Sequence, residues 1–96
     1  MTELDIACKP APDGGWSCRV TIDENGRRVS EHVVHVATAD LAQLDPGARE
    51  PHLLVDRSFR FLLARESASS ILHSFDLMVI ARYFPEYEAT ITDRAN

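Results

Sequence analysis

Two histidines stand at a spacing that could bind a metal ion in this 96-residue chain. His32 and His35 form an H-x-x-H pair, which can chelate a metal when both rings lie on one side of a helix. The surrounding residues are rich in β-branched side chains and predict a strand, where positions three apart face opposite sides. We therefore expect no metal site at this pair, and no other motif indicates a cofactor.

Cys18 suggests a thiol nucleophile paired with a histidine base. One of the hairpin registers considered below puts Cys18 across from His32, but no third group is evident to orient the base. Cys18 also alternates with Trp16 and Val20, a pattern typical of a small buried residue. The chain has no G-x-S-x-G elbow and no phosphate-binding glycine loop. We therefore expect a protein that is not an enzyme.

Composition limits the partners and the compartment. The net charge is −5, with 45% apolar and 26% charged residues, a globular balance that does not favour binding to nucleic acid or anionic membranes. Residues 1–5 lack the features of a signal peptide, and no apolar stretch is long enough to span a bilayer. These features predict a cytoplasmic protein with reduced thiols. A Cys8–Cys18 disulfide would be the alternative in an oxidising compartment.

An antiparallel β-hairpin is predicted at about residues 16–36. Apolar and polar residues alternate from Trp16 to Ile22, and a β-branched run follows Asn25-Gly26, a dipeptide typical of hairpin turns. A two-residue turn would put Val29, Glu31, Val33 and His35 on the inner face. A three-residue loop that includes Glu24 would put Ser30, His32, Val34 and Val36 there. The second register is favoured, because the first buries the Glu31 carboxylate.

The second half predicts a short helix at residues 39–44, capped by Thr38, and three packed helices at about 51–65, 67–75 and 77–84. The apolar sector of the helix at 51–65 is wider than a surface helix needs. Apolar residues at 77–84 point in nearly every direction, so that helix must be enclosed by its own domain or by a second chain. The fold class is α+β.

The predicted domain covers residues 16–88. Prolines and glycines between residues 10 and 15 suggest that residues 1–15 form a flexible arm, and residues 89–96 are typical of a frayed tail.

Several strings within residues 16–88 resemble a small bacterial protein family of unknown function. They include SFRFLLARE at residues 58–66 and YFPEYE at residues 83–88. The family has no known activity that the resemblance could imply. It does imply that His32, Val34 and Val36 hold the alternating inner positions of the second strand. The arm at residues 1–15 has no counterpart in it.

The leading functional hypothesis is a small non-enzymatic interaction or assembly module, which self-associates or binds a protein partner. It follows from the apolar helix at 77–84 and the wide apolar face at 51–65. Residues 83–88 have two interpretations, a lid over the core or an acidic-aromatic docking patch, and buried aromatics favour the lid. The candidate interaction surface consists of Val79, Ile80, Tyr83, Phe84 and Tyr87.

The alternative hypothesis is a DNA-binding or antitoxin-like regulatory protein. The helices at 67–75 and 77–84 would form a helix-turn-helix, with several arginines nearby. Only Arg82 in the second helix could read base edges, and the net charge opposes DNA binding.

Overall fold

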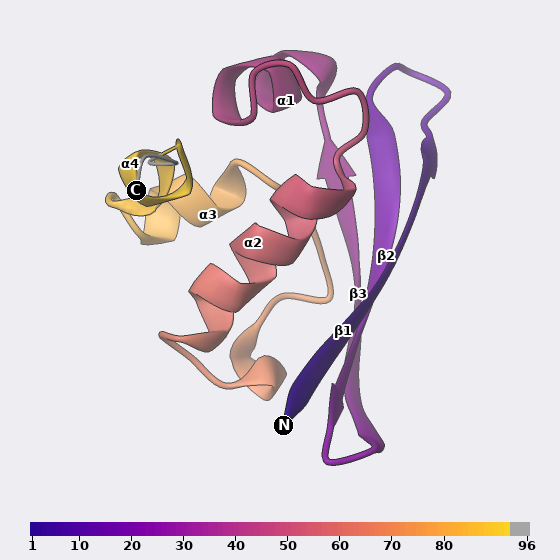
Figure 1. Ribbon diagram of the computed structural model, residues 1–96, viewed down its shortest axis with the longest axis vertical. Helices are drawn as coiled ribbons and strands as arrows, with labels where there is room; N and C mark the ends of the chain where they lie inside the picture. Colours follow the sequence, from indigo (N-terminus) through magenta and orange to yellow (C-terminus); the bar gives the residue numbers. More distant parts are fainter. Residues whose placement is uncertain (93–96) are drawn as a thin grey trace.

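A four-stranded mixed sheet with helices packed on one face forms the structure, a computed structural model that describes residues 1–92 (Figure 1). The sheet order follows the chain: β1 (Thr2–Pro10), β2 (Trp16–Glu24), β3 (Arg27–Val36) and β4 (Ser74–Asp76). The helices are α1 (Thr38–Leu44), α2 (His52–Leu63), the 3-10 turn η1 (Ala68–Ser70), α3 (Val79–Tyr83) and α4 (Tyr87–Thr92). The predicted α+β class is confirmed.

The predicted antiparallel hairpin is present as β2 and β3. Asn25 and Gly26 form a two-residue turn, both with the positive φ angles that such a turn requires, 55° and 80°. A bulge leaves Val29 without a partner between the pairs Asp23–Arg28 and Ile22–Ser30. The turn is therefore shorter than the favoured loop. The bulge nevertheless restores the favoured inner face, which carries Ser30, His32, Val34 and Val36.

Residues 1–15 do not form the flexible arm that the sequence suggests. β1 pairs with β2 along its whole length, from Thr2 opposite Glu24 to Pro10 opposite Trp16. Its alternating side chains Leu4, Ile6 and Cys8 belong to or pack against the core. The burial of these apolar groups stabilises the strand. The prolines and glycines are accommodated by the end of β1 and the loop at residues 11–15.

The two cysteines form a disulfide, which corrects the expectation of reduced thiols. Cys8 and Cys18 are directly paired across β1 and β2, with their Cα atoms 4.0 Å apart. Cys18 faces Val34 on its other side rather than His32. The pairing of β1, which the sequence analysis did not expect, brings the two thiols together.

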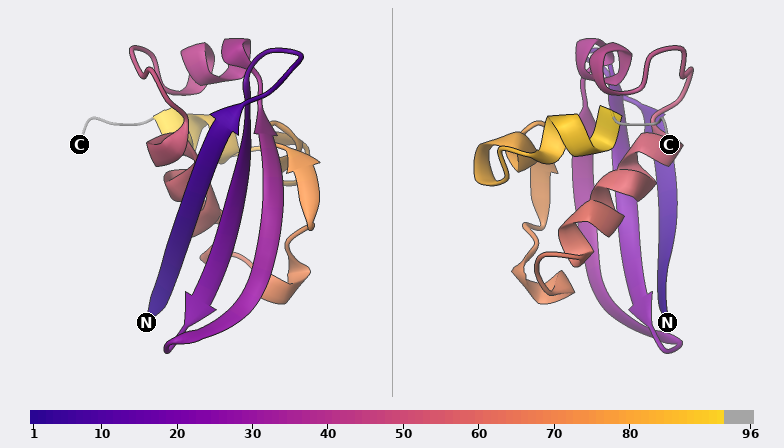
Figure 2. Two further views of the ribbon diagram at one scale, coloured as in Figure 1. Left: turned by 90° about the vertical axis from the view of Figure 1, so that its right-hand side faces the viewer. Right: turned by 60° about the vertical axis from the view of Figure 1, so that its left-hand side comes forward.

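The predicted helix at 67–75 is wrong. Residues 68–70 form the turn η1, and β4 follows, pairing in parallel with the outer side of β3 (Figure 2). The backbone N–H of Val33 donates to the carbonyl of His73 at 2.7 Å, and that of Leu77 donates to His35 at 2.9 Å. An extended strand directs Phe75 and Leu77 to one side, whereas Ser74 and Asp76 face solvent.

The remaining helices are partly as predicted. α1 and α2 lie where expected, although Ala37 rather than Thr38 occupies the N-cap of α1. The predicted helix at 77–84 is reduced to α3, because Leu77 continues the chain from β4 and Phe84 is extended. α4 occupies part of the predicted frayed tail, with Ile91 buried in the core. Residues 93–96 of that tail lie outside the described residues.

The helices cover only one face of the sheet, and the opposite face is open to solvent (Figure 2). Phe59, Val55 and Leu54 of α2 are fully buried beneath the inner face. Within residues 1–92, no helix has both the length and the apolar character needed to cross a membrane.

Candidate functional site

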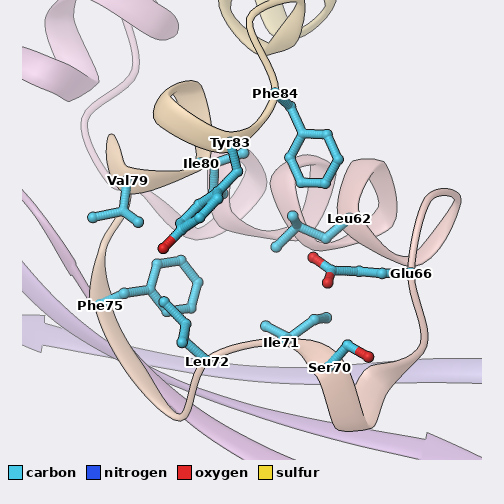
Figure 3. Close-up of a pocket in the computed structure, with 10 residues that line it drawn as sticks. All are labelled: Leu62, Glu66, Ser70, Ile71, Leu72, Phe75, Val79, Ile80, Tyr83 and Phe84. Carbon is cyan, nitrogen blue, oxygen red and sulfur yellow. The ribbon is translucent and has the colours of Figure 1, made fainter.

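An apolar groove opens between the end of α2, the segment from η1 to β4, and α3 (Figure 3). Its volume is about 270 Å³. Ten residues line it: Leu62, Glu66, Ser70, Ile71, Leu72, Phe75, Val79, Ile80, Tyr83 and Phe84. We refer to this site as the apolar groove.

Two exposed side chains form the rim of the apolar groove. Tyr83 is 68% exposed and Leu72 is 49% exposed, although both are large and carry apolar surface. Figure 3 shows Tyr83 extending from α3 toward Phe75, with Leu72 on the far side of the Phe75 ring. A concave apolar site beside exposed apolar side chains is typical of an interaction surface.

A single carboxylate enters the apolar lining. Glu66, in the segment just after α2, directs its carboxylate toward the groove from the side of Leu62 (Figure 3). No ion pair with Glu66 is formed by any other residue between 1 and 92. The apolar groove therefore combines an apolar floor with one negative group at its side.

The neighbouring Arg65 is engaged elsewhere. Its Nε donates to Glu86 at 3.1 Å, and its guanidinium lies 3.6 Å from the centre of the Phe61 ring. A hydrogen bond from the backbone of Glu86, and then the bond from Arg65, hold the pKa of the Glu86 carboxyl below its usual range. Arg65 thus joins the end of α2 to the chain after α3.

Four of the five predicted interaction residues line the apolar groove. Val79 and Phe84 are half-buried, Tyr83 is exposed, and Ile80 lies at the floor with 3% exposure. Tyr83 alone among them presents most of its surface to solvent. The domain alone therefore does not enclose residues 77–84 at Tyr83, and the alternative of cover by a second chain stays a prediction there.

Tyr87 does not belong to this surface. Its side chain is fully buried, and its hydroxyl lies 2.7 Å from the Ser58 hydroxyl. Burial raises the pKa of Tyr87 to about 12, an effect that the hydrogen bond with Ser58 partly offsets. Tyr87 also packs edge-on against Phe61. The lid interpretation of residues 83–88 therefore describes Tyr87, whereas Tyr83 faces outward.

Six residues of the groove were missed by the sequence analysis: Leu62, Glu66, Ser70, Ile71, Leu72 and Phe75. The expectation of a helix at 67–75 assigned Ile71, Leu72 and Phe75 to one packed face, whereas Leu72 is 49% exposed. The alternation of Ser74, Phe75, Asp76 and Leu77 was an available signal for a short strand.

His32 is hydrogen-bonded to the backbone of Leu72, one of the residues that line the apolar groove. Its ring is 1% exposed, its Nδ1 lies 2.6 Å from the Leu72 carbonyl, and its Nε2 lies 2.9 Å from the Ser30 hydroxyl. Because a carbonyl only accepts, Nδ1 carries a proton and donates it to Leu72. Burial lowers the pKa of His32. This bond fixes the backbone of Leu72, whose side chain forms part of the rim.

His35 faces the opposite side of β3, as predicted for a strand. Its Nδ1 lies 3.5 Å from the Asp76 carboxylate, and its Nε2 lies 3.8 Å from that of Asp13. The ring therefore bridges β4 and the loop between β1 and β2. Across residues 1–92, no group of three or more His, Cys, Asp or Glu side chains is placed to hold a metal ion.

The helix-turn-helix proposed for residues 67–84 is not formed. The first of its two helices is replaced by η1 and β4, and α3 has only five residues. Arg82 is exposed on α3. The first helix of the motif, which would hold α3 against the DNA, is missing.

No family model, curated protein or solved structure matches this chain. The resemblance of residues 16–88 to a family of unknown function therefore stays an expectation, and the functional argument depends on the geometry alone.

Proposed function

We propose that this chain is a small non-enzymatic interaction module, and that its apolar groove receives an apolar side chain from a partner protein. The observation that carries the proposal is the exposure of Leu72 and Tyr83 at the rim of a concave apolar site. Leaving this much apolar surface in water is unfavourable, so a partner that covers it gains free energy.

The size of the groove favours a side-chain anchor over a small-molecule substrate. Its volume of about 270 Å³ lies just below the range of about 300–1,000 Å³ in which small-molecule sites usually fall. One or two large side chains can fill such a site. Interface hot spots are commonly aromatic or arginine side chains seated in pockets of this kind.

Charge narrows the chemistry of the partner. Glu66 places a carboxylate beside the apolar lining, and the whole chain has a net charge of −5. A partner segment that carries Lys or Arg next to its apolar anchor would approach favourably and pair with Glu66. We therefore propose a basic, amphipathic peptide segment as the bound element.

The most reactive side chains are engaged in structural roles, which supports the non-enzymatic part of the proposal. Cys18 is in a disulfide with Cys8, and His32 makes two hydrogen bonds in the core. Nucleophilic catalysis by a cysteine would need a free thiolate with a base beside it. Cys18 has no free thiol, and both ring nitrogens of His32 are already hydrogen-bonded.

A cytoplasmic location stays a prediction, and the Cys8–Cys18 disulfide counts against it. Disulfides are rare in reducing compartments. Trapping the thiols of Cys8 and Cys18 with an alkylating reagent during cell lysis tests it. Reduced thiols in cells would support a cytoplasmic location, whereas an oxidised pair would oppose it.

The interaction is tested by panning a random peptide library on the folded protein. We expect enriched peptides with an aromatic or large aliphatic residue near a Lys or Arg. Their affinity should fall at least about tenfold for Tyr83→Asp, the loss expected when a central anchor contact is removed. Leu53→Asp is the matched control, because Leu53 is also 68% exposed but lies on α2 outside the apolar groove.

Three further outcomes decide the proposal. Glu66→Gln should weaken basic peptides more than neutral ones, because only the former pair with the carboxylate. Enriched peptides that bind Tyr83→Asp as tightly as the wild type would contradict the groove as the site. A library that yields no peptides above background would contradict peptide binding by this module.

A further inference from the structure

β1 is a long strand at the free edge of the sheet. It has nine residues and pairs with β2 on one side only, since the sheet order is β1-β2-β3-β4. Natural edge strands are usually short or bulged, or they are protected by proline, by charged side chains or by a covering element. β1 is regular throughout its pairing with β2, and its charged residues Glu3, Asp5 and Lys9 lie on the solvent face of the sheet.

The register shows which backbone groups of β1 face the open edge. The Met1 carbonyl accepts a bond from the N–H of Asn25, its opposite residue, at 3.1 Å. Hydrogen-bonded and non-hydrogen-bonded pairs alternate along an antiparallel ladder, so the odd-numbered residues of β1 bond to β2. The close Cα spacing of 4.0 Å at Cys8–Cys18 agrees with a non-hydrogen-bonded pair. The N–H and C=O groups of Leu4, Ile6 and Cys8 therefore point away from β2.

We propose that β1 pairs antiparallel with β1 of a second copy of this chain, in the register that centres on Ile6. This register places Glu3 of each copy opposite Lys9 of the other, because the residue numbers of each pair sum to 12. Opposite charges directly across two strands are favourable. The outward groups of Leu4, Ile6 and Cys8 then meet their counterparts as hydrogen-bonded pairs.

The neighbouring registers that keep the same face inward are less favourable. Centring on Asp5 would place the two Asp5 carboxylates directly opposite each other, which is destabilising. Centring on Ala7 would pair Asp5 with Lys9, but only residues 4–10 of the two strands would then lie opposite each other, whereas all nine residues of β1 are paired when the register centres on Ile6. The full length of pairing and the Glu3–Lys9 pairs thus favour the register centred on Ile6.

The resulting dimer goes beyond the proposed function. The two sheets would join into one continuous sheet, with the helices of both copies on the same side. The apolar groove lies beside β4, at the opposite edge of the sheet from β1, so both grooves stay open. The dimer would therefore present two binding sites, which raises the avidity for a partner with two anchors.

Charge reversal at the paired residues tests the dimer. Sedimentation or light scattering should find a wild-type dimer, with self-association weakened about tenfold in Lys9→Glu and in Glu3→Lys, because each variant creates two like-charge pairs. The double variant Glu3→Lys with Lys9→Glu should recover dimerisation. A mixture of the two single variants should form a heterodimer, because every pair then carries opposite charges.

Three outcomes would overturn the proposal. They are a monomeric wild type at high concentration, single variants that dimerise as tightly as the wild type, or a double variant that does not recover. Circular dichroism checks that each variant is folded. Folding is expected, because Glu3 and Lys9 are exposed in the monomer. Tyr83→Asp should leave the dimer intact, with the same assembly mass in solution as the wild type. Loss of dimerisation can therefore be distinguished from loss of peptide binding at the apolar groove.

Amide exchange provides a second readout that does not depend on variants. Protection of the Leu4, Ile6 and Cys8 amides should increase with protein concentration. The amides of Asp5 and Ala7 should be protected at all concentrations, because they bond to β2 within one copy. Concentration-independent exchange at Leu4, Ile6 and Cys8 would contradict the paired edge.

Discussion

The hydroxyl groups of Ser58 and Tyr87 lie 2.7 Å apart in the core, and they join α2 to α4. Ser58 also donates to the Leu54 carbonyl at 2.8 Å, so the Tyr87 hydroxyl is the donor to Ser58. Arg57 adds a hydrogen bond to the Ile91 carbonyl. The six-residue α4 is thus held by side chains of one longer helix.

Removal of the Tyr87 hydroxyl should weaken this attachment. Tyr87→Phe keeps the ring in place but loses one buried hydrogen bond, at a cost of about 1 kcal/mol in the free energy of unfolding. Urea denaturation followed by circular dichroism measures this change. Tyr83→Phe is the control, because Tyr83 is exposed and no hydrogen bond of its hydroxyl is formed with residues 1–92.

Alkaline pH should destabilise the wild type through the same residue. Burial raises the pKa of folded Tyr87 from 10.0 to about 12, so the unfolded chain loses this proton first. Stability from this residue is complete below pH 10 and is lost between pH 10 and about 12, up to roughly 3 kcal/mol. Tyr87→Phe should show a smaller fall in stability over that range. An equal fall in both proteins would show that Tyr87 is not protected from ionisation.

Local sequence patterns correctly predicted the hairpin and α2, because the pattern typical of each lies within its own residues. The Asn25-Gly26 turn and the alternation before it predicted the hairpin, and the apolar periodicity predicted α2. The bulge at Val29 could not be predicted from local patterns. Its extra residue allows a two-residue turn at Asn25-Gly26 and also places His32 and Val34 on the buried face, and these two requirements meet only when the strands are paired.

The pairing of distant strands was harder to infer. The alternation of Leu4, Ile6 and Cys8 with solvent-facing residues is typical of a strand. The prolines and glycines at residues 10–15 nevertheless favoured a flexible arm in the prediction. β4 has three residues, and its partner lies about forty positions earlier in the chain. The candidate site was therefore only half predicted. Tyr83 and its neighbours on α3 were found, whereas Leu72 and Phe75 depended on β4.

Acidic pH should destabilise the fold through His32. Burial lowers its pKa in the folded state, so the unfolded chain takes up a proton first as the pH falls below 6.5. The contribution of His32 to stability is present above that pH and is lost as the pH falls through its lowered folded pKa. His32→Gln should flatten the dependence of unfolding free energy on pH between 7 and 5.

His52→Gln provides the matched control for His32, because His52 is exposed at the start of α2. The pH dependence of this variant should follow that of the wild type. If both variants flatten the curve equally, the burial of His32 is not the cause.

The disulfide should contribute measurably to stability. Cys8 and Cys18 are separated by ten residues, and closing a loop of this size in the unfolded chain is worth roughly 2–3 kcal/mol. Reductant should lower the urea midpoint of the wild type by a corresponding amount. The double variant Cys8→Ala with Cys18→Ala should be insensitive to reductant, and sensitivity there would point to another effect of the reagent.

The two glycines before β2 should respond differently to alanine. A Cβ at Gly15 would lie 2.3 Å from the Val36 carbonyl oxygen, whereas one at Gly14 meets nothing within 4 Å. Both have positive φ, so each substitution costs about 1–2 kcal/mol in backbone strain. Gly15→Ala should lose clearly more stability than Gly14→Ala in thermal denaturation. Equal losses would contradict the close packing of this loop on β3.

Chemical-shift mapping with a small aromatic cation tests the apolar groove most directly. Phenylpropylammonium has a ring for the apolar floor and an ammonium group for Glu66, and a ligand of this size should bind in roughly the millimolar range. We predict that amide shifts cluster at Leu72, Phe75, Val79 and Tyr83, and that phenylpropionate of equal size causes smaller ones. Shifts spread over the open face of the sheet, or equal shifts from both compounds, would contradict a groove that recognises a basic apolar anchor.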